Sequence, residues 1–218
     1  MITAKAPFQF ATASYVTRVE HQKATSISEL YGCLEQASDA AIFYHTFQSL
    51  GRYHFLTEGF SNDFAQWVLE SLNQPELAER LAGIDVRDYT SIPDLRTDLR
   101  KIVSEFVERY PRRVEQVAFE PFYFLSNVEV TRLLPWDART LAGFRAGLER
   151  LSHSSFYYHF ISSRLRLHLH TNDFSHWFAT SLGLERLAQR ADRIDIYTNT
   201  LDSARKELID IVDSEVGQ

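Results

Sequence analysis

The chain repeats itself, and this duplication limits what it can fold into more than any other feature of its sequence. Strings of identical residues recur in the same order in both halves, at a constant interval apart from one short deletion. A unit of roughly 100 residues that is written twice predicts two copies of one fold. The matching strings are Pro7-Phe8 and Phe10 with Pro121-Phe122 and Phe124, Val16-Thr17-Arg18 with Val130-Thr131-Arg132, Tyr44-His45 with Tyr158-His159, Asn62-Asp63-Phe64 and Trp67 with Asn172-Asp173-Phe174 and Trp177, and Ile84-Asp85 with Ile194-Asp195.

The boundary between the two copies lies in a charged stretch that Pro111 interrupts. Proline and charged residues between two periodic segments are typical of a linker. We therefore expect a first helical repeat unit over residues 1–110, a linker over 111–120 and a second helical repeat unit over 121–218.

Within each copy, a short aromatic lead-in precedes segments with the periodicity of helices. Ser26 and Glu29 form a capping box, and Asn62 is a suitable N-cap for the segment that follows it. Apolar residues then recur at helical spacing over residues 27–34, 40–55, 64–72, 77–84 and 93–110. Residues 164–170 alternate like an exposed strand, but the matching residues 50–56 do not, so we expect a helix there too. The sequence predicts an all-α fold: two homologous multi-helix units related by approximate twofold pseudo-symmetry.

The composition is that of a soluble globular protein, with 44% hydrophobic residues and a formal net charge of −6. Neither half is basic, so a nucleic-acid partner is not expected. No apolar stretch approaches the length of a membrane span, and no basic and apolar leader is present. Cys33 is the single cysteine, which excludes an internal disulfide and fits a reducing compartment. We expect a cytoplasmic protein with no membrane contact.

One polar face occurs in both copies and is the strongest candidate for a binding site. His45, Ser49 and Arg52 follow at helical spacing, and the matching positions of the second copy keep the same residue types. The face could line a pocket in which histidine binds or transfers protons and arginine grips an anion. It could equally be a hydrogen-bonded network that holds helices in register. With the neighbouring residues, the ligand-binding candidates are Tyr44, His45, Ser49, Arg52, Tyr158, His159, Ser163, Arg166, Asp63 and Asp173.

The string Asn-Asp-Phe-x-x-Trp, at residues 62–67 and 172–177, fits a helix cap followed by a buried aromatic pair. Asp63 or Asp173 could serve as a catalytic carboxylate only with a pKa raised by an apolar pocket. We expect no cofactor, because glycine-rich phosphate loops and hydrolase motifs are missing.

A metal site is not expected either. His45 and His54 would point to opposite sides of one helix. In the second copy, His168, His170, Asp173 and His176 are closely spaced. However, His170 and His176 have no matching histidine in the first copy.

The strings Phe43-Tyr44-His45-Thr46 and Asn62-Asp63-Phe64-Ala65-Gln66-Trp67, preceded by Pro7-Phe8-Gln9-Phe10, resemble an uncharacterised prokaryotic family catalogued as a domain of unknown function. The resemblance covers nearly the whole chain, twice. The second copy departs from the pattern at Phe160 and Ser175. The resemblance implies no activity and no catalytic residue.

We expect the chain to be a binding or scaffold module whose partner is a protein or a small ligand held between the repeats. One alternative is an enzyme that acts on an anionic substrate through the histidine and arginine of the polar face. A further alternative is a subunit of a larger complex whose exposed aromatic residues are buried on assembly.

Overall fold

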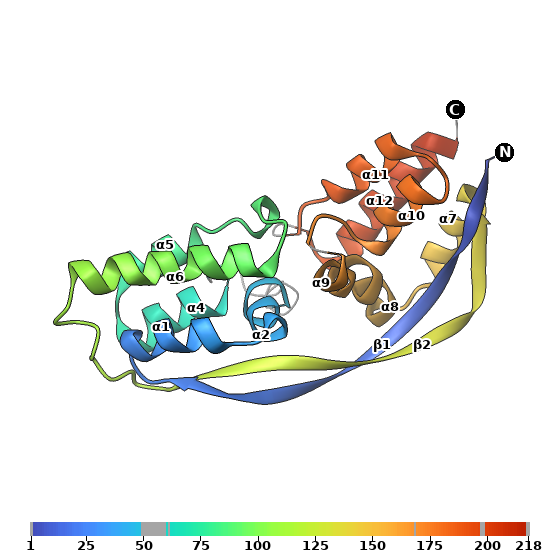
Figure 1. The fold of residues 1–218 in the computed structure, drawn as a ribbon. Coiled ribbons are helices and arrows are strands. Elements are labelled where there is room, and N and C mark those ends of the chain that lie inside the picture. The colour runs from blue at the N-terminus through green and yellow to red at the C-terminus, as the bar shows by residue number, and fades with distance from the viewer. Residues whose placement is uncertain (1, 49–59, 61, 168, 197–198, 217–218) are drawn as a thin grey trace. The chain divides into compact units, whose positions relative to one another are not determined.

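The protein has an α+β fold, so the prediction of an all-α fold is wrong. The computed structural model describes residues 2–48, 60, 62–167, 169–196 and 199–216 (Figure 1). Strands β1 (Thr3–Ala24) and β2 (Phe122–Thr140) form a two-stranded antiparallel sheet. Each strand begins in the aromatic lead-in that we expected to be short and continues as far as the first helix of its repeat.

The strands lack a sequence signal because long stretches of them have no covered face. Phe8 and Phe10 alternate with exposed neighbours at the start of β1, as a half-buried strand should. Over Val16–Val19, however, four consecutive residues are exposed, and in β2 the exposed run extends over Val128–Leu133. Alternation arises only where one face of a sheet is buried and the other is solvated. The exposed stretches of β1 and β2 therefore lack the apolar–polar alternation by which a strand is recognised in a sequence.

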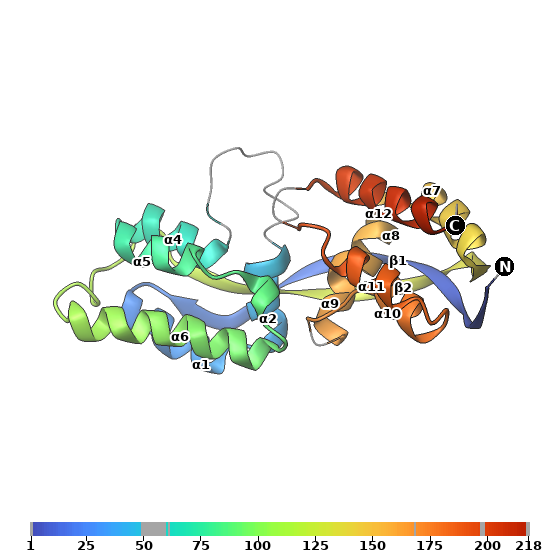
Figure 2. The same ribbon diagram turned by 90° about the horizontal axis from the view of Figure 1, so that it is seen from above.

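After its strand, each repeat supplies the same succession of helices (Figures 1 and 2). The first copy has α1 (Ile27–Gln36), α2 (Asp39–Phe43), the π-helical segment η1 (Tyr44–Gln48), α4 (Asp63–Leu72), α5 (Pro75–Ala82), the 3-10 segment η2 (Val86–Asp88) and α6 (Ile92–Arg109). The second has α7 (Leu141–Arg150), α8 (His153–Tyr157), the π-helical segment η3 (Tyr158–Ser162), α9 (Ser163–Arg166), α10 (Asp173–Thr180), α11 (Glu185–Asp192) and α12 (Leu201–Val216).

Side-chain caps fix where several of these helices begin, as the sequence predicted. Ser26 accepts a hydrogen bond from the Glu29 N–H at the start of α1, and Asn62 accepts one from the Ala65 N–H at the start of α4. The expected helix over residues 164–170 is only partly present, because α9 ends at Arg166 and Leu169 has a left-handed φ of 64°. The matching residues 50–56 lie outside the described residues.

The chain forms two compact units. Each unit contains the helices of one repeat and the first residues of the strand that belongs to the other repeat. One unit is Val16–Val128, and the other joins Met1–Tyr15 to Glu129–Gln218. The second unit thus combines the helices of the second repeat with the aromatic lead-in of the first. The first unit combines the helices of the first repeat with the lead-in of the second.

Aromatic rings that pack against one another hold each exchanged lead-in in place. Phe8 lies with its ring centroid 5.1 Å from that of Phe144, and the Phe10 ring stacks on the same residue at 5.8 Å. In the other unit, Phe122 lies 5.1 Å from Phe64. Truncating a fully buried phenylalanine of this kind typically costs about 3–5 kcal/mol. The lead-ins therefore belong to the cores of the units that receive them.

Gly147 in α7 leaves room for the ring of Phe10. A Cβ atom at this position would overlap with that ring, which is fully buried and cannot turn away. Gly32 in α1, by contrast, has open space where its Cβ would be. Both glycines lie inside helices, so the two sites differ in packing and share the same helix propensity.

We therefore expect Gly147→Ala to lower the free energy of unfolding by about 1–3 kcal/mol through overpacking. The matched control, Gly32→Ala, should raise it by up to about 1 kcal/mol, because alanine is the better helix former. Urea unfolding followed by circular dichroism measures both. Equal stabilisation by the two substitutions would contradict the packing of Phe10 on α7.

Candidate functional site

His159, one of the predicted site residues, connects a helix to the exchanged strand. It lies in the π-helical segment η3 and is buried. Its Nδ1 is 2.7 Å from Oδ2 of Asp173, the first residue of α10. On the other side of the ring, Nε2 accepts a hydrogen bond of 2.9 Å from the main-chain N–H of Ala11 in β1. Both ring nitrogens are therefore engaged.

His45 makes the same pair of contacts in the other unit. Its Nδ1 is 2.8 Å from Oδ2 of Asp63, and its Nε2 accepts a hydrogen bond of 2.8 Å from the Leu125 N–H in β2. Leu125 and Ala11 occupy matching positions in the two repeats. The duplication has thus preserved a complete Asp–His–strand arrangement in each unit.

The hydrogen bonds assign the protonation of both imidazoles. Because Nε2 accepts a main-chain N–H, it carries no proton, and the ring proton must be on Nδ1, where it is donated to the carboxylate. A histidine that acts as a general base needs a nitrogen with a free lone pair facing the substrate. In this conformation neither His45 nor His159 has such a nitrogen. Their contacts correspond to the second interpretation of the polar face, a hydrogen-bonded network that holds elements of the fold in register.

The repeated string Asn-Asp-Phe-x-x-Trp makes most of the other contacts to the exchanged strand. In the second copy, Asn172 caps α10, Asp173 orients the imidazole, and Phe174 packs with its ring 5.6 Å from that of Phe8. The Trp177 indole N–H donates to the Ala6 carbonyl at 2.8 Å. Its counterpart Trp67 donates to the Glu120 carbonyl at 2.7 Å. The string is therefore a strand-docking motif.

Ser163 and Arg166, also predicted, extend the arrangement in the second unit. The Ser163 hydroxyl donates to the His159 carbonyl at 2.6 Å and accepts from the Asp173 N–H at 3.3 Å. Arg166 forms an ion pair with the Asp173 carboxylate and lies over the Tyr158 ring, 4.9 Å from its centroid. The structure thus brings together all five predicted ligand-binding candidates of the second copy, Tyr158, His159, Ser163, Arg166 and Asp173. Tyr44 is buried beside His45, whereas Ser49, Arg52 and His54 lie outside the described residues.

Three further polar residues near this ion pair have no motif that would have revealed them. The Tyr15 hydroxyl lies 2.8 Å from that of Ser162, and burial raises the pKa of Tyr15, which keeps it protonated. Desolvation also raises the pKa of Glu129, with Arg166 opposing and Asp173 adding to the rise. Tyr15 and Glu129 occupy matching repeat positions that carry different residues. This difference between the two repeats was the one feature of the sequence that could have drawn attention to Tyr15 and Glu129.

A buried arginine and a half-buried aspartate that influence each other through their charges distinguish the second unit. Arg164 is 5% exposed and donates to the Phe160 and Leu169 carbonyls at 3.3 and 3.4 Å. Burial lowers the pKa of its guanidinium group, and the charge of Asp192 opposes this shift. Burial likewise raises the pKa of Asp192, against the hydrogen bond from Thr171 and the charge of Arg164. The matching positions of the first repeat hold leucine and alanine, at residues 50 and 82.

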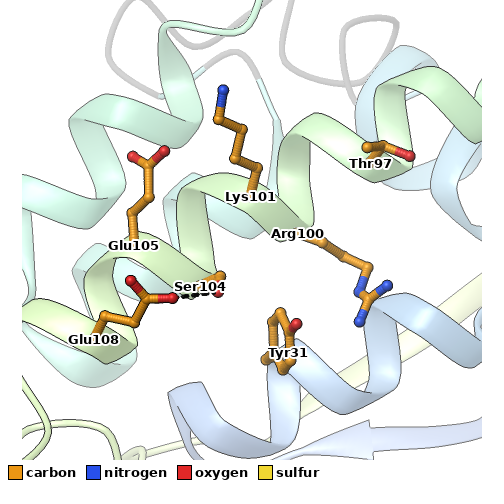
Figure 3. Close-up of a pocket in the computed structure, with 7 residues that line it drawn as sticks. All are labelled: Tyr31, Thr97, Arg100, Lys101, Ser104, Glu105 and Glu108. Atoms are coloured by element: carbon orange, nitrogen blue, oxygen red, sulfur yellow. Dashed lines mark hydrogen bonds between the residues drawn. The ribbon is translucent and has the colours of Figure 1, made fainter.

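A shallow depression of about 330 Å³ lies on α6, away from both histidines (Figure 3). Tyr31 of α1 lines one side, with the Arg100 guanidinium 4.8 Å from its ring centroid. Along α6, Ser104 donates to Glu108 at 3.4 Å. Arg100 also lies 3.4 Å from the Glu35 carboxylate. Ser104 and Arg100 are thus each paired with an acidic side chain, and the described lining of the depression has no arrangement typical of a catalytic site.

Neither a metal centre nor a membrane span is apparent in the described part of the chain. No group of three or more His, Cys, Asp and Glu side chains there is placed to hold a metal ion. Every described helix is too short or too polar to cross a lipid bilayer.

Comparisons with known proteins identify one family and one similar solved structure. A family model described as "Family of unknown function (DUF5752)" matches residues 5–213. The solved structure of OrfY from Thermoproteus tenax is similar over 99% of this chain and 98% of that chain, with a TM-score of 0.85 and 29% sequence identity. No curated protein matches.

We expect His159→Ala to lower the free energy of unfolding by about 2–4 kcal/mol, because it leaves the buried Ala11 N–H without its acceptor and removes one of the two side chains that bind the Asp173 carboxylate. Native-state hydrogen exchange should show faster exchange at the Ala11 amide. The control His153→Ala removes an imidazole whose side chain is 65% exposed and paired with Asp202, and should change stability by less than about 0.5 kcal/mol. Unaltered protection of Ala11 would contradict the role of His159.

The residues of the first repeat suggest which substitutions test the interaction between Arg164 and Asp192: leucine for Arg164 and alanine for Asp192. Arg164→Leu and Asp192→Ala should each cost about 1–3 kcal/mol. The first leaves two main-chain carbonyls without their donor, and the second leaves the Thr171 hydroxyl and the Asn172 amide without their acceptor. The double variant, which restores the residue types of the first repeat, should cost at least about 1 kcal/mol less than the two together. Urea unfolding of the four proteins measures this coupling. Additive effects would mean that the two charges do not interact.

Proposed function

The chain belongs to the DUF5752 family, whose description states no function, and from its geometry we propose that it is a protein-binding module. The proposal rests on one observation: apolar side chains stand exposed on both strands, at positions that match between the repeats. Val16 and Val130 are 60% and 62% exposed, and Val19 and Leu133 are 63% and 68% exposed. Most other large apolar side chains of the described chain are buried.

Burial of these exposed apolar side chains by a partner would be energetically favourable. A two-stranded ribbon with no covered face is marginally stable in water. Exposed apolar side chains on an unpaired strand edge also invite association. After duplication, four such side chains would drift to polar types if they had no use. Their retention in both copies supports a binding surface rather than chance.

The alternative of an enzyme that works through the polar face receives no comparable support. Both histidines use Nδ1 and Nε2 within their own units, and Arg166 is paired with Asp173. A subunit of a larger complex remains compatible with protein binding, since such a subunit would bury the same strand residues.

The test is photo-crosslinking in the cells from which the chain comes, with a photoreactive amino acid at position 19 or 133. We expect a defined protein adduct from both positions. The control position is 216, where Val216 on α12 is likewise apolar and 50% exposed. Val19→Glu and Leu133→Glu should each reduce recovery of the same partner at least about tenfold, because a buried charge costs more than 1.4 kcal/mol. The same adducts from position 216, or none from 19 and 133, would refute the proposal.

A further inference from the structure

The outer edge of β2, the side away from β1, carries main-chain groups for which the described residues supply no partner. The Leu125 N–H points away from β1, because it donates to His45. Main-chain groups alternate in direction along a strand, so those of Thr131 and Leu133 also point outward. The Leu134 and Trp136 carbonyls fit this alternation, since both face inward and accept from the Gln9 side chain of β1.

Helices cover part of the outer edge of each strand but leave Val130–Leu133 open. In β1, the Lys5 N–H donates to the Ser181 carbonyl and the Ala11 N–H donates to His159. Within the described residues, no helix or loop forms a hydrogen bond with Val130–Leu133. Pro135 then ends the usable edge, because proline has no N–H to donate. The open edge is thus a short segment with defined limits.

The side chains of this edge specify a ligand of definite chemistry. Val130 and Leu133 are apolar, and Arg132 is exposed with no carboxylate at ion-pair distance among the described residues. The first repeat differs, because there Arg18 forms an ion pair of 2.9 Å with Glu20. At the position matching Glu20, the second repeat has Leu134. The charge of Arg132 is therefore available to a partner.

A second copy of the chain is a poor occupant of this edge. Antiparallel pairing of two identical edges would bring the two Arg132 side chains near each other, and a charged residue on an edge strand opposes such self-pairing. An acidic side chain opposite Arg132 would instead be attracted.

We infer that an extended polypeptide segment in which acidic and apolar residues alternate adds as a strand to β2 at Val130–Leu133. This inference rests on the proposed protein-binding function and names the partner's chemistry. Main-chain hydrogen bonds to Thr131 and Leu133 supply affinity, as in other cases of strand addition. Contacts with Leu133 and the charge of Arg132 supply specificity.

The test is selection of random peptides of about twelve residues displayed on phage against the full-length chain. We expect enrichment of peptides that alternate Asp or Glu with Val, Ile or Leu. In fluorescence anisotropy, Arg132→Glu should weaken the selected peptides about tenfold, and peptides with Lys in place of the acidic residues should prefer that variant. Methylation of the main-chain nitrogens that face β2 should abolish binding. The matched control, Arg18→Glu, should alter affinity less than about twofold.

Three results would overturn the inference: no enriched peptide, equal affinity for the wild type and Arg132→Glu, or retained binding by the N-methylated peptides. Sedimentation that shows a dimer lost in Leu133→Glu would overturn it as well, in favour of a second copy. If a protein crosslinks through position 19 while no peptide depends on Arg132, the protein-binding function stands and this assignment of the edge fails. If no protein crosslinks through position 19 and no peptide depends on Arg132, both the protein-binding function and the assignment of the edge fail.

Discussion

The fold depends on the hydrogen bond between a strand N–H and a buried imidazole, which occurs once in each unit. Each imidazole can accept this bond only because a carboxylate holds its proton on Nδ1, so aspartate, histidine and strand form a single cooperative set. The aromatic rings of the lead-in provide most of the burial energy, but rings alone do not fix register. The Asp–His pair supplies the directional contact that selects one register.

The helices were predictable because their signals are local. Ser26 and Asn62 cap helices whose apolar stripes recur at a spacing that one buried face dictates. The strands were not predictable in this way. Val128–Leu133 has no covered face, and Phe8 and Phe10 find their partners far away in the sequence. A single sequence carries no sign of which distant helix receives a strand.

The residues of the candidate site were found in part, through the repeat rather than through a catalytic pattern. His159, Ser163, Arg166 and Asp173 come together as one polar face. The sequence could not tell that Nε2 faces a main-chain N–H, because that donor lies on a strand contributed by the other repeat. Tyr15 reaches the face from that same exchanged strand, and Glu129 reaches it from β2. Periodicity within one helix says nothing about either residue.

The exchange of lead-ins also sets an order for folding during synthesis. The unit formed by Val16–Val128 is continuous, so all its parts are present once residue 128 has left the ribosome. The first fifteen residues belong to the other unit and must wait for α7 and α10. Until then Phe8 and Phe10 have no core to enter. This segment is thus made before the continuous unit but folds after it, and during that interval its apolar rings are open to proteases and chaperones.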